Sequence, residues 1–309
     1  MTDTLQKFLF EHTPVRGEFV ELSDTWQQAK SRHNYPAAVQ NLLGEMMAAA
    51  ALLSANLKFN GSIIMQIHGD GPVKLLVVEC DADLRLRATA KLREHAEIPD
   101  HADLQQLVHQ HGQGRFVITL DPHEKLPGQQ AYQGIVPLNG DTIASVIESY
   151  MLRSEQLDTL IWLAADDKVA RGMLLQKLPD HGGNLNPAHE SQNQTIDWQH
   201  LQMLGNTLKR EELLSADIAT LQRRLFWEQD LRVFEPLSLS FYCSCSREKV
   251  ANMLNMLGHE EIAAALSERE EIEIQCDFCG KEYRFDAVDC ASLFLNPAQD
   301  PQSGNQTRH

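Results

Sequence analysis

The chain has 309 residues, of which 43% are apolar, enough for a substantial hydrophobic core and for more than one domain. Asp and Glu outnumber Lys and Arg by 43 to 27, and the resulting net charge of −16 disfavours nucleic acid as a partner. The most apolar run, Met46 to Leu53, is far shorter than the roughly 20 residues of a membrane-spanning helix, so no membrane partner is expected. The first twelve residues have neither a basic segment nor an export cleavage site, which predicts a cytoplasmic protein.

Residues 1–179 are predicted to form an N-terminal α+β domain. Strong helix formers after Pro36 predict a long packed helix that ends near Asn60 and Gly61, and a second helix follows a cap at Asp141 or Thr142. Alternating apolar residues between turn signals predict strands, the second to fourth of which form a β-meander. These strands are Val15–Leu22, Ser62–His68, Val73–Glu79, Leu84–Leu92, Arg115–Leu120, Tyr132–Leu138, Asp158–Ala164 and Ala170–Leu178.

Two short motifs in this domain invite a functional interpretation that the surrounding residues do not support. The glycine-rich turn at Gly69-Asp70-Gly71 resembles part of a phosphate-binding loop, but it lacks the lysine and the following helix. His109 and His111 have a spacing that could bind a metal, yet they flank a polar loop. A turn and a solvated loop are the favoured interpretations.

Residues 180–242 are predicted to be a flexible and helical linker region. The stretch from Asp180 to Thr195 is almost entirely polar, Gly or Pro. Two amphipathic helices follow, with apolar residues at helical spacing from Trp198 to Leu208 and from Ile218 to Leu225. Because such short helices cannot bury their apolar faces on each other alone, they are expected to dock on a neighbouring domain, and that docking can be conditional.

Residues 243–295 are predicted to form a small C-terminal zinc-binding domain, followed by a disordered tail at residues 296–309. A strand over Leu237–Tyr242 runs into the first of two cysteine pairs. A helical hairpin follows, from Ser246 to Leu266, with Gly258 between the helices. Alternating residues on both sides of the second pair predict two more strands, so the hairpin brings the two pairs together.

The two cysteine pairs are the most specific feature of the chain. The ligand candidates are Cys243 and Cys245 in the first pair, and Cys276 and Cys279 in the second. Each pair supplies two sulfur atoms locally, and four thiolates suit tetrahedral zinc, which predicts one Zn²⁺ per chain in the reduced state. Gly280 after the second pair fits the tight turn of a metal knuckle.

Zinc binding and disulfide formation exclude each other at such a site. Zinc bonds of about 2.3 Å hold the sulfur atoms roughly 3.8 Å apart, whereas a disulfide bond is about 2.05 Å long. Because a small zinc site contributes on the order of 10 kcal/mol to folding, losing the ion is expected to unfold the domain. The other two cysteines, Cys80 and Cys290, match neither pair and are expected to be buried and unreactive.

Several motifs together resemble the heat-shock protein 33 family, the redox-regulated bacterial holdase chaperones, over nearly the whole chain. They include VRGEFVEL (Val15 to Leu22), LKFNGSIIMQIHGDGP (Leu57 to Pro72), YQGIVPLNGDTIASVIESYMLRSEQL (Tyr132 to Leu157), GMLLQ, KREELL, CSCSRE and CDFCG. The resemblance implies an ATP-independent chaperone that is inactive while zinc is bound.

The resemblance also implies how the chaperone is activated. On oxidation, Cys243 pairs with Cys245 and Cys276 with Cys279, zinc is lost, the linker region unfolds, and the protein dimerises and binds unfolding client proteins. Cys80 and Cys290 are not part of this pattern.

Two other function classes remain as alternatives. A zinc-ribbon-like nucleic-acid or protein adaptor module uses similar cysteine pairs, but residues 243–290 hold five Lys and Arg against eleven Asp and Glu, which opposes phosphate binding. A thiol-disulfide oxidoreductase places its cysteines at a helix start, whereas Gly280 and a strand pattern follow Cys279 here. No nucleophile, base and orienting partner form an active site, so no enzyme activity is expected.

Overall fold

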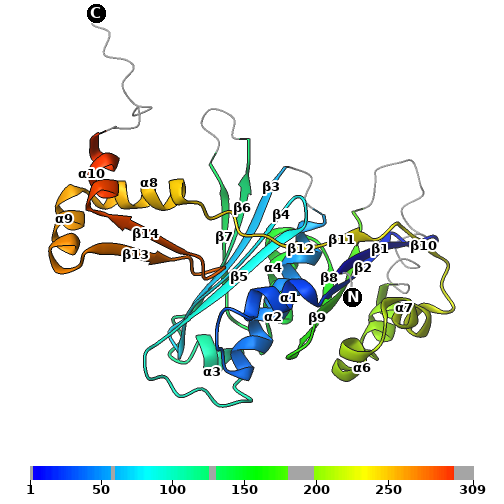
Figure 1. Cartoon of the computed structure of the whole chain (residues 1–309). Coiled ribbons are helices and arrows are strands. Elements are labelled where there is room, and N and C mark those ends of the chain that lie inside the picture. Colours follow the sequence, from blue (N-terminus) through cyan, green and yellow to red (C-terminus); the bar gives the residue numbers. More distant parts are fainter. Residues whose placement is uncertain (1–2, 57–59, 125–129, 180–197, 296–309) are drawn as a thin grey trace, which may run out of the picture. The chain divides into compact units, whose positions relative to one another are not determined.

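A computed structural model describes residues 3–56, 60–124, 130–179 and 198–295 (Figure 1). The predicted polar stretch of the linker and the predicted tail lie outside these residues. The chain divides into two compact units, residues 1–242 and residues 243–309.

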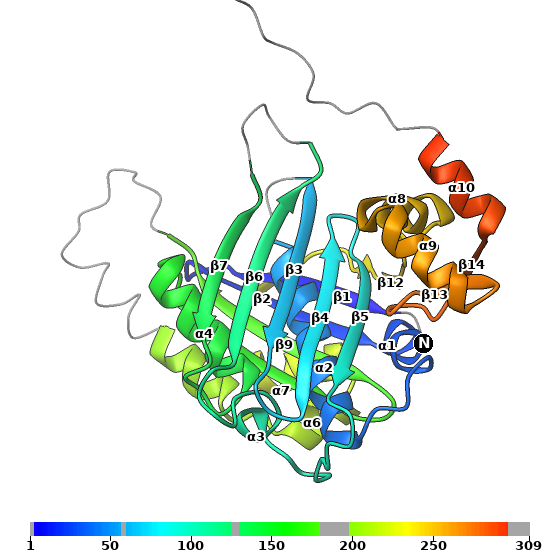
Figure 2. The ribbon, with the colours of Figure 1, turned by 90° about the vertical axis from the view of Figure 1, so that its left-hand side faces the viewer.

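The first unit contains two six-stranded sheets. The first sheet has the order β10-β1-β2-β9-β8, with β11 also paired to β1, and the second has the order β12-β5-β4-β3-β6-β7 (Figure 2). The strands of the first sheet are β1 (Thr4–Phe10), β2 (Val15–Leu22), β8 (Thr159–Ala165), β9 (Ala170–Lys177), β10 (Leu231–Val233) and β11 (Leu237–Ser238). Those of the second are β3 (Gly61–His68), β4 (Val73–Asp81), β5 (Arg85–Leu92), β6 (Arg115–Pro122), β7 (Tyr132–Pro137) and β12 (Ser240–Phe241). All pairs are antiparallel except β12 with β5.

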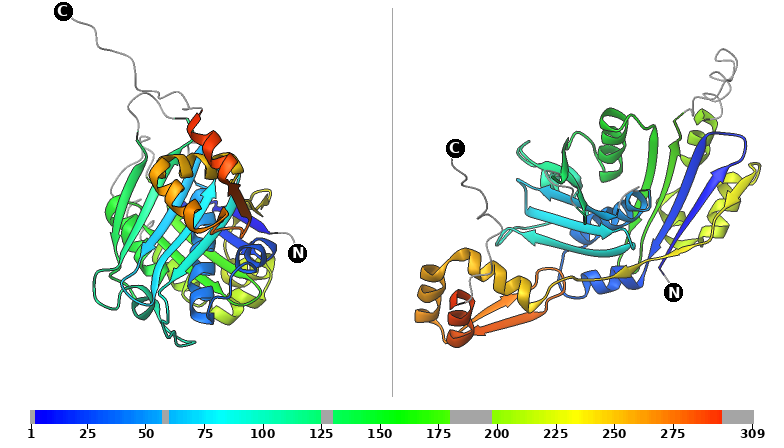
Figure 3. Two further views of the ribbon diagram at one scale, coloured as in Figure 1. Left: turned by 60° about the vertical axis from the view of Figure 1, so that its left-hand side comes forward. Right: turned by 90° about the horizontal axis from the view of Figure 1, so that it is seen from above.

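The helix α2 (Ala37–Ser54) lies between the two sheets and forms the centre of the main core (Figure 3). Its small residues permit close contact, and a Cβ atom at Gly44 would lie only 2.5 Å from that of Ala165. Among the described residues, α2 alone has the length and composition of a membrane span, but 78% of that window is buried in the fold. It is therefore the core helix that the sequence predicts.

The amphipathic helices of the predicted linker cover the other face of the first sheet. Residues 198–205 are helical, and α6 (Arg210–Ser215) and α7 (Ile218–Phe226) follow. Phe226 packs against Phe8 and Phe10, with ring centroids 5.7 and 5.2 Å apart. This second hydrophobic cluster joins the helices to β1, β2, β8 and β9.

The structure confirms the α+β class and the β-meander and adds elements that the sequence pattern did not reveal. The unpredicted helices of the first unit are α1 (Asp24–Lys30), α3 (Leu104–Val108) and α6, whereas α4 (Ile143–Ser154) was predicted. The strands β1 and β10 were also not predicted. The long helix ends at Ser54 rather than near Asn60, and the Asn56 side chain donates a hydrogen bond to the Leu52 carbonyl at this end.

The second unit is a helical hairpin packed against a two-stranded sheet. Its elements are α8 (Arg247–Leu257), α9 (His259–Glu268), β13 (Glu271–Gln275), β14 (Glu282–Asp286) and α10 (Ala287–Leu295), the last of which was not predicted. Ser246 caps α8 by accepting a hydrogen bond from the Lys249 amide, and Gly258 ends it with a positive φ of 94°. The hydrophobic cluster found among the described residues of the unit is small, with five buried members: Leu254, Ile262, Tyr283, Phe285 and Cys290.

Candidate metal centre

The second cysteine pair lies in the turn that joins β13 to β14. The Cys276 amide donates to the Lys281 carbonyl at 2.9 Å, and the Gly280 amide donates to the Cys276 carbonyl at 2.8 Å. Gly280 has a φ of 68°, a conformation that glycine adopts without strain, as expected for a knuckle. The turn thus presents two sulfur atoms from one short loop.

The first cysteine pair lies in the extended segment just before α8. Arg247, the first residue of that helix, fixes this segment against the sheet: its guanidinium group stacks on the Phe285 ring at 4.2 Å. The same group donates to the Arg284 carbonyl at 2.7 Å and pairs with Asp289 at 2.6 Å. The start of α8 is therefore anchored to β14 and α10, which brings the first pair to the second.

The four sulfur atoms converge on one point. All lie within 4.8 Å of one another. The Cys243 and Cys276 sulfur atoms are 3.6 Å apart, and those of Cys245 and Cys279 are 3.3 Å apart. All six cysteines of the chain are thiols, outside any disulfide bond, in this structure.

Two thiols of the cluster have pKa values shifted in opposite directions. Burial and contact with the neighbouring thiols raise the pKa of Cys279 to about 12. Burial alone would also raise the pKa of Cys245, but the hydrogen bonds from Tyr283 and the adjacent thiols outweigh it and lower this pKa to about 7. Thiolates cannot accumulate at such short distances without a compensating cation, because like charges repel.

A side chain that the sequence pattern did not indicate also contacts the cluster. The Tyr283 hydroxyl group donates a hydrogen bond to the Cys245 sulfur at 3.1 Å. Tyr283 is on β14, and only 5% of its surface is exposed. The one available signal was its inward position on an alternating strand four residues after Cys279.

These residues fit a tetrahedral metal ion. Sulfur separations of 3.3 and 3.6 Å are close to the roughly 3.8 Å expected around an ion with metal–sulfur bonds of about 2.3 Å. A divalent cation would also balance the charge of the thiolates. The cluster can therefore bind a metal through four sulfur ligands.

Comparison with known proteins identifies the family. A family model described as Hsp33 protein matches residues 3–286. The chain belongs to the Hsp33 family. It is 47% identical to the 33 kDa chaperonin of Methylobacillus flagellatus, over 100% of this chain and 99% of that protein. It is 48% identical to the 33 kDa chaperonin of Chromobacterium violaceum, over 94% of each chain.

A solved Hsp33 structure has the same fold. The crystal structure of the 33 kDa chaperonin (Hsp33 homologue) of Thermotoga maritima aligns with a TM-score of 0.76 and covers 94% of this chain and 98% of that one, at 20% identity. The resemblance noted in the sequence is thus confirmed. Since the Hsp33 family is one of chaperones, membership also agrees with the expectation that the chain is not an enzyme.

The two cysteines outside the two pairs are not part of the sulfur cluster. Cys80 is fully buried in β4 of the first unit, and burial raises its pKa to about 12. Cys290 is 2% exposed in the core of the second unit, and burial also raises its pKa. Both are buried, protonated thiols, as the sequence predicts.

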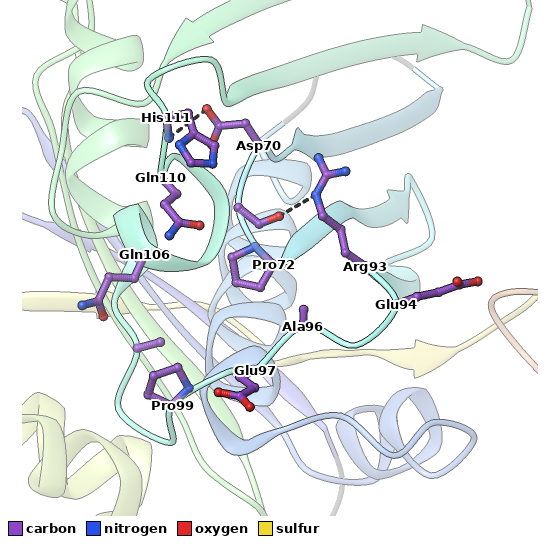
Figure 4. A pocket seen from close by; sticks show the side chains of 12 residues that line it. Asp70, Pro72, Arg93, Glu94, Ala96, Glu97, Pro99, Gln106, Gln110 and His111 are labelled. Carbon is purple, nitrogen blue, oxygen red and sulfur yellow. Dashed lines mark hydrogen bonds between the residues drawn. The ribbon is translucent and has the colours of Figure 1, made fainter.

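The glycine-rich turn and the histidine loop meet at an open hollow of about 690 Å³ in the first unit (Figure 4). The Asp70 carboxylate accepts hydrogen bonds from the His111 and Gln113 amides, at 3.1 and 2.6 Å. An anion would need these amides, and the protein's own carboxylate already occupies them. Arg93 donates to the Gly71 carbonyl at 2.8 Å. These two amides and this Arg93 group therefore already have acceptors within the protein.

Proposed function

We propose that this chain is a redox-regulated, ATP-independent holdase that binds unfolding proteins under oxidative stress. The observation that carries the proposal is the convergence of four cysteine thiols from two sequence-distant pairs on one point. Family membership supports the chaperone role over a zinc-ribbon-like adaptor.

In the reduced and inactive state, the metal ligands are Cys243, Cys245, Cys276 and Cys279, and the ion is one Zn²⁺ per chain. Zinc supplies a redox-inert cross-link between the cysteine pairs and neutralises their thiolates. The small core of the second unit makes this cross-link important, because small domains commonly need a metal or disulfides to remain folded.

Oxidation converts the four ligands into two disulfides, Cys243–Cys245 and Cys276–Cys279. Each disulfide consumes two thiols and one hydrogen peroxide and yields two water molecules. Disulfide sulfur atoms no longer bind zinc, so the site loses its ion. The two short sulfur contacts in the reduced structure run between the pairs, from Cys243 to Cys276 and from Cys245 to Cys279. Disulfides across the pairs are therefore the competing outcome for a mapping experiment.

The unfolding signal passes to residues 180–242, which we propose act as a linker between a core of residues 1–179 and the zinc domain of residues 243–295. The described helices of this linker cover an apolar face that includes Phe8, Phe10 and Phe19. Their release would uncover aromatic surface suited to unfolded clients. The oxidised protein would then form a homodimer in the cytoplasm, without nucleic acid or membrane as a partner.

The test is an oxidant titration of the full chain that measures zinc content and suppression of client aggregation together. Reduced protein should hold one zinc ion and leave a thermally unfolding client unprotected. Peroxide with mild heat should release zinc and switch on protection of the client. The fraction of zinc released should match the fraction of full protection at each oxidant concentration.

Two results would contradict the proposal. One is a Cys243→Ser, Cys276→Ser variant that retains both zinc and redox dependence. The other is oxidised protein whose residues 198–226 exchange amide hydrogens as slowly as in the reduced state. Cys80→Ser is the matched control, because it removes a thiol outside the cluster.

A further inference from the structure

Tyr283 connects the two cysteine pairs without being a ligand. It follows the second pair on β14, but its hydroxyl group bonds to Cys245 of the first pair at 3.1 Å. The contact therefore joins two segments 38 positions apart in the sequence.

The position of the Tyr283 ring is fixed by its surroundings. Tyr283 is opposite Ile274 in the β13–β14 pairing, and the Cys276 amide bond to the Lys281 carbonyl holds the adjoining turn. The Lys281 ammonium group lies 5.3 Å from the centre of the ring. A buried phenol in so constrained a position directs its single hydrogen at one acceptor.

We propose that Tyr283 is a positioning residue that sets how readily the cluster is oxidised, by donating its hydroxyl hydrogen to the Cys245 sulfur. This inference rests on the proposed function of the cluster as a zinc-bound redox switch. Hydrogen bonds from the surroundings of a metal site orient its ligands and tune their electron density.

The chemistry gives the direction of the effect. A thiolate sulfur attacks one peroxide oxygen with a lone pair, the O–O bond breaks, and a sulfenic acid and water result once a proton is added. A second thiolate then attacks that sulfur and displaces hydroxide, which takes a proton to give water. A hydrogen bond to the Cys245 sulfur withdraws electron density from its lone pairs and slows the first attack. The hydroxyl group therefore slows oxidation of this ligand.

The test compares Tyr283→Phe with Tyr242→Phe in the full chain. Phenylalanine keeps the buried ring and removes only the donor. Tyr242 is 47% exposed and adjacent to Cys243, so its substitution controls for loss of a nearby hydroxyl group.

Three readouts should change in Tyr283→Phe and not in the control. The rate of peroxide-driven zinc release should rise roughly tenfold, because the free energy of one hydrogen bond to a charged group corresponds to about that factor in a rate. Dimedone, which traps sulfenic acids, should label Cys245 more than in the parent protein. With cobalt(II) in place of zinc, the sulfur-to-metal charge-transfer band should move to longer wavelength, because the sulfur lone pairs rise in energy.

Unchanged zinc release and an unchanged cobalt band in Tyr283→Phe would overturn the inference. Failure of the variant to bind any metal would also overturn it, because one hydrogen bond accounts for about a tenfold effect and not for loss of the site. If the parent protein itself bound no zinc, or released none on oxidation, the proposed function would fail instead.

Discussion

Glu18 places an ionisable carboxyl group inside the first unit, where it is 1% exposed. It pairs in register with Lys7 of β1, and Arg16 and Asn56 are its other polar neighbours. One carboxyl oxygen, Oε2, has no hydrogen-bond partner among the described residues. Burial raises the pKa of Glu18 to about 7, against the weaker opposing effects of Lys7, Asn56 and Arg16.

This raised pKa predicts a pH-dependent stability. The unfolded chain releases the Glu18 proton near the ordinary glutamate pKa of 4.5, whereas the folded chain retains it up to a pKa of about 7. The stability of the first unit should therefore fall as pH rises through this interval and level off above it, by at most about 3 kcal/mol. Glu18→Gln should remove this loss and stabilise the first unit above neutral pH.

Urea unfolding followed by tryptophan fluorescence would measure the effect, since Trp26, Trp162, Trp198 and Trp227 all lie in the first unit. The exposed Glu94, changed to Gln, is the control. If the stability of Glu18→Gln and that of the parent protein depended on pH in the same way, the Glu18 carboxyl group would not be the source of this pH dependence.

At the scale of elements, two arginines hold α6 against the core. Arg171 of β9 donates to the carbonyls of Leu213 and Ala216, which lie at the C-terminal end of α6, where backbone acceptors have no helical partner. Arg210, the first residue of α6, pairs with Glu45 of α2 at 2.8 Å. Burial raises the pKa of Glu45, and the Arg210 hydrogen bond opposes the shift.

Arg210→Met should loosen α6 in the reduced protein, because it leaves a mostly buried carboxylate without its cation. Since the Arg210 side chain is 42% exposed, the cost should be only about 1 to 2 kcal/mol. Amide hydrogen exchange over residues 210–226 should accelerate by roughly tenfold while the exchange of α2 stays unchanged.

Arg223→Met on the exposed face of α7 provides the comparison, because it removes the same charge from a neighbouring helix. Equal exchange rates in the two variants would show that the pair with Glu45 does not hold the helix.

The sequence pattern was sufficient for elements with strong local periodicity and insufficient for those that depend on distant partners. The strand Val15–Leu22 has alternating apolar residues and matches β2. By contrast, β10 has three residues and is a strand because β1 is beside it. The predicted strand Leu237–Tyr242 is divided between the two sheets as β11 and β12, with the buried Leu239 between them.

The same distinction applies to the cluster. The spacing of the four cysteines was enough to predict that they converge, because each pair is local and a helical hairpin closes the distance. The contact from Tyr283 to Cys245 was not predictable, since it depends on the register of β13 with β14 and on the direction of one side chain.

At the scale of the whole molecule, the two units have very unequal cores. The first has two hydrophobic clusters built around α2 and around the phenylalanines of β1 and β2, whereas the single cluster found in the described part of the second has only five buried residues. The stability of the second unit should therefore depend on the metal that we propose it binds, and that of the first should not.

Chelation of the metal from the reduced full chain should unfold residues 243–295 and leave the first unit folded. Segment-resolved hydrogen exchange should show loss of protection in β13 and β14, with α2 and β9 as internal controls. Adding zinc back under reducing conditions should restore the protection. Retained protection in β13 and β14 after complete chelation would show that the small hydrophobic core keeps the second unit folded without a metal.

The pairing of β1 with residues near position 231 affects how the protein is made. Gln6 of β1 contacts Phe234, 228 positions later in the chain. At about 5 to 20 residues per second, the ribosome needs roughly 10 to 45 s to produce this partner. During that interval the outer edge of β1 is open, and open strand edges invite association with other chains. The open edge of nascent β1 is therefore exposed to the same kind of association from which we propose the finished protein protects its clients.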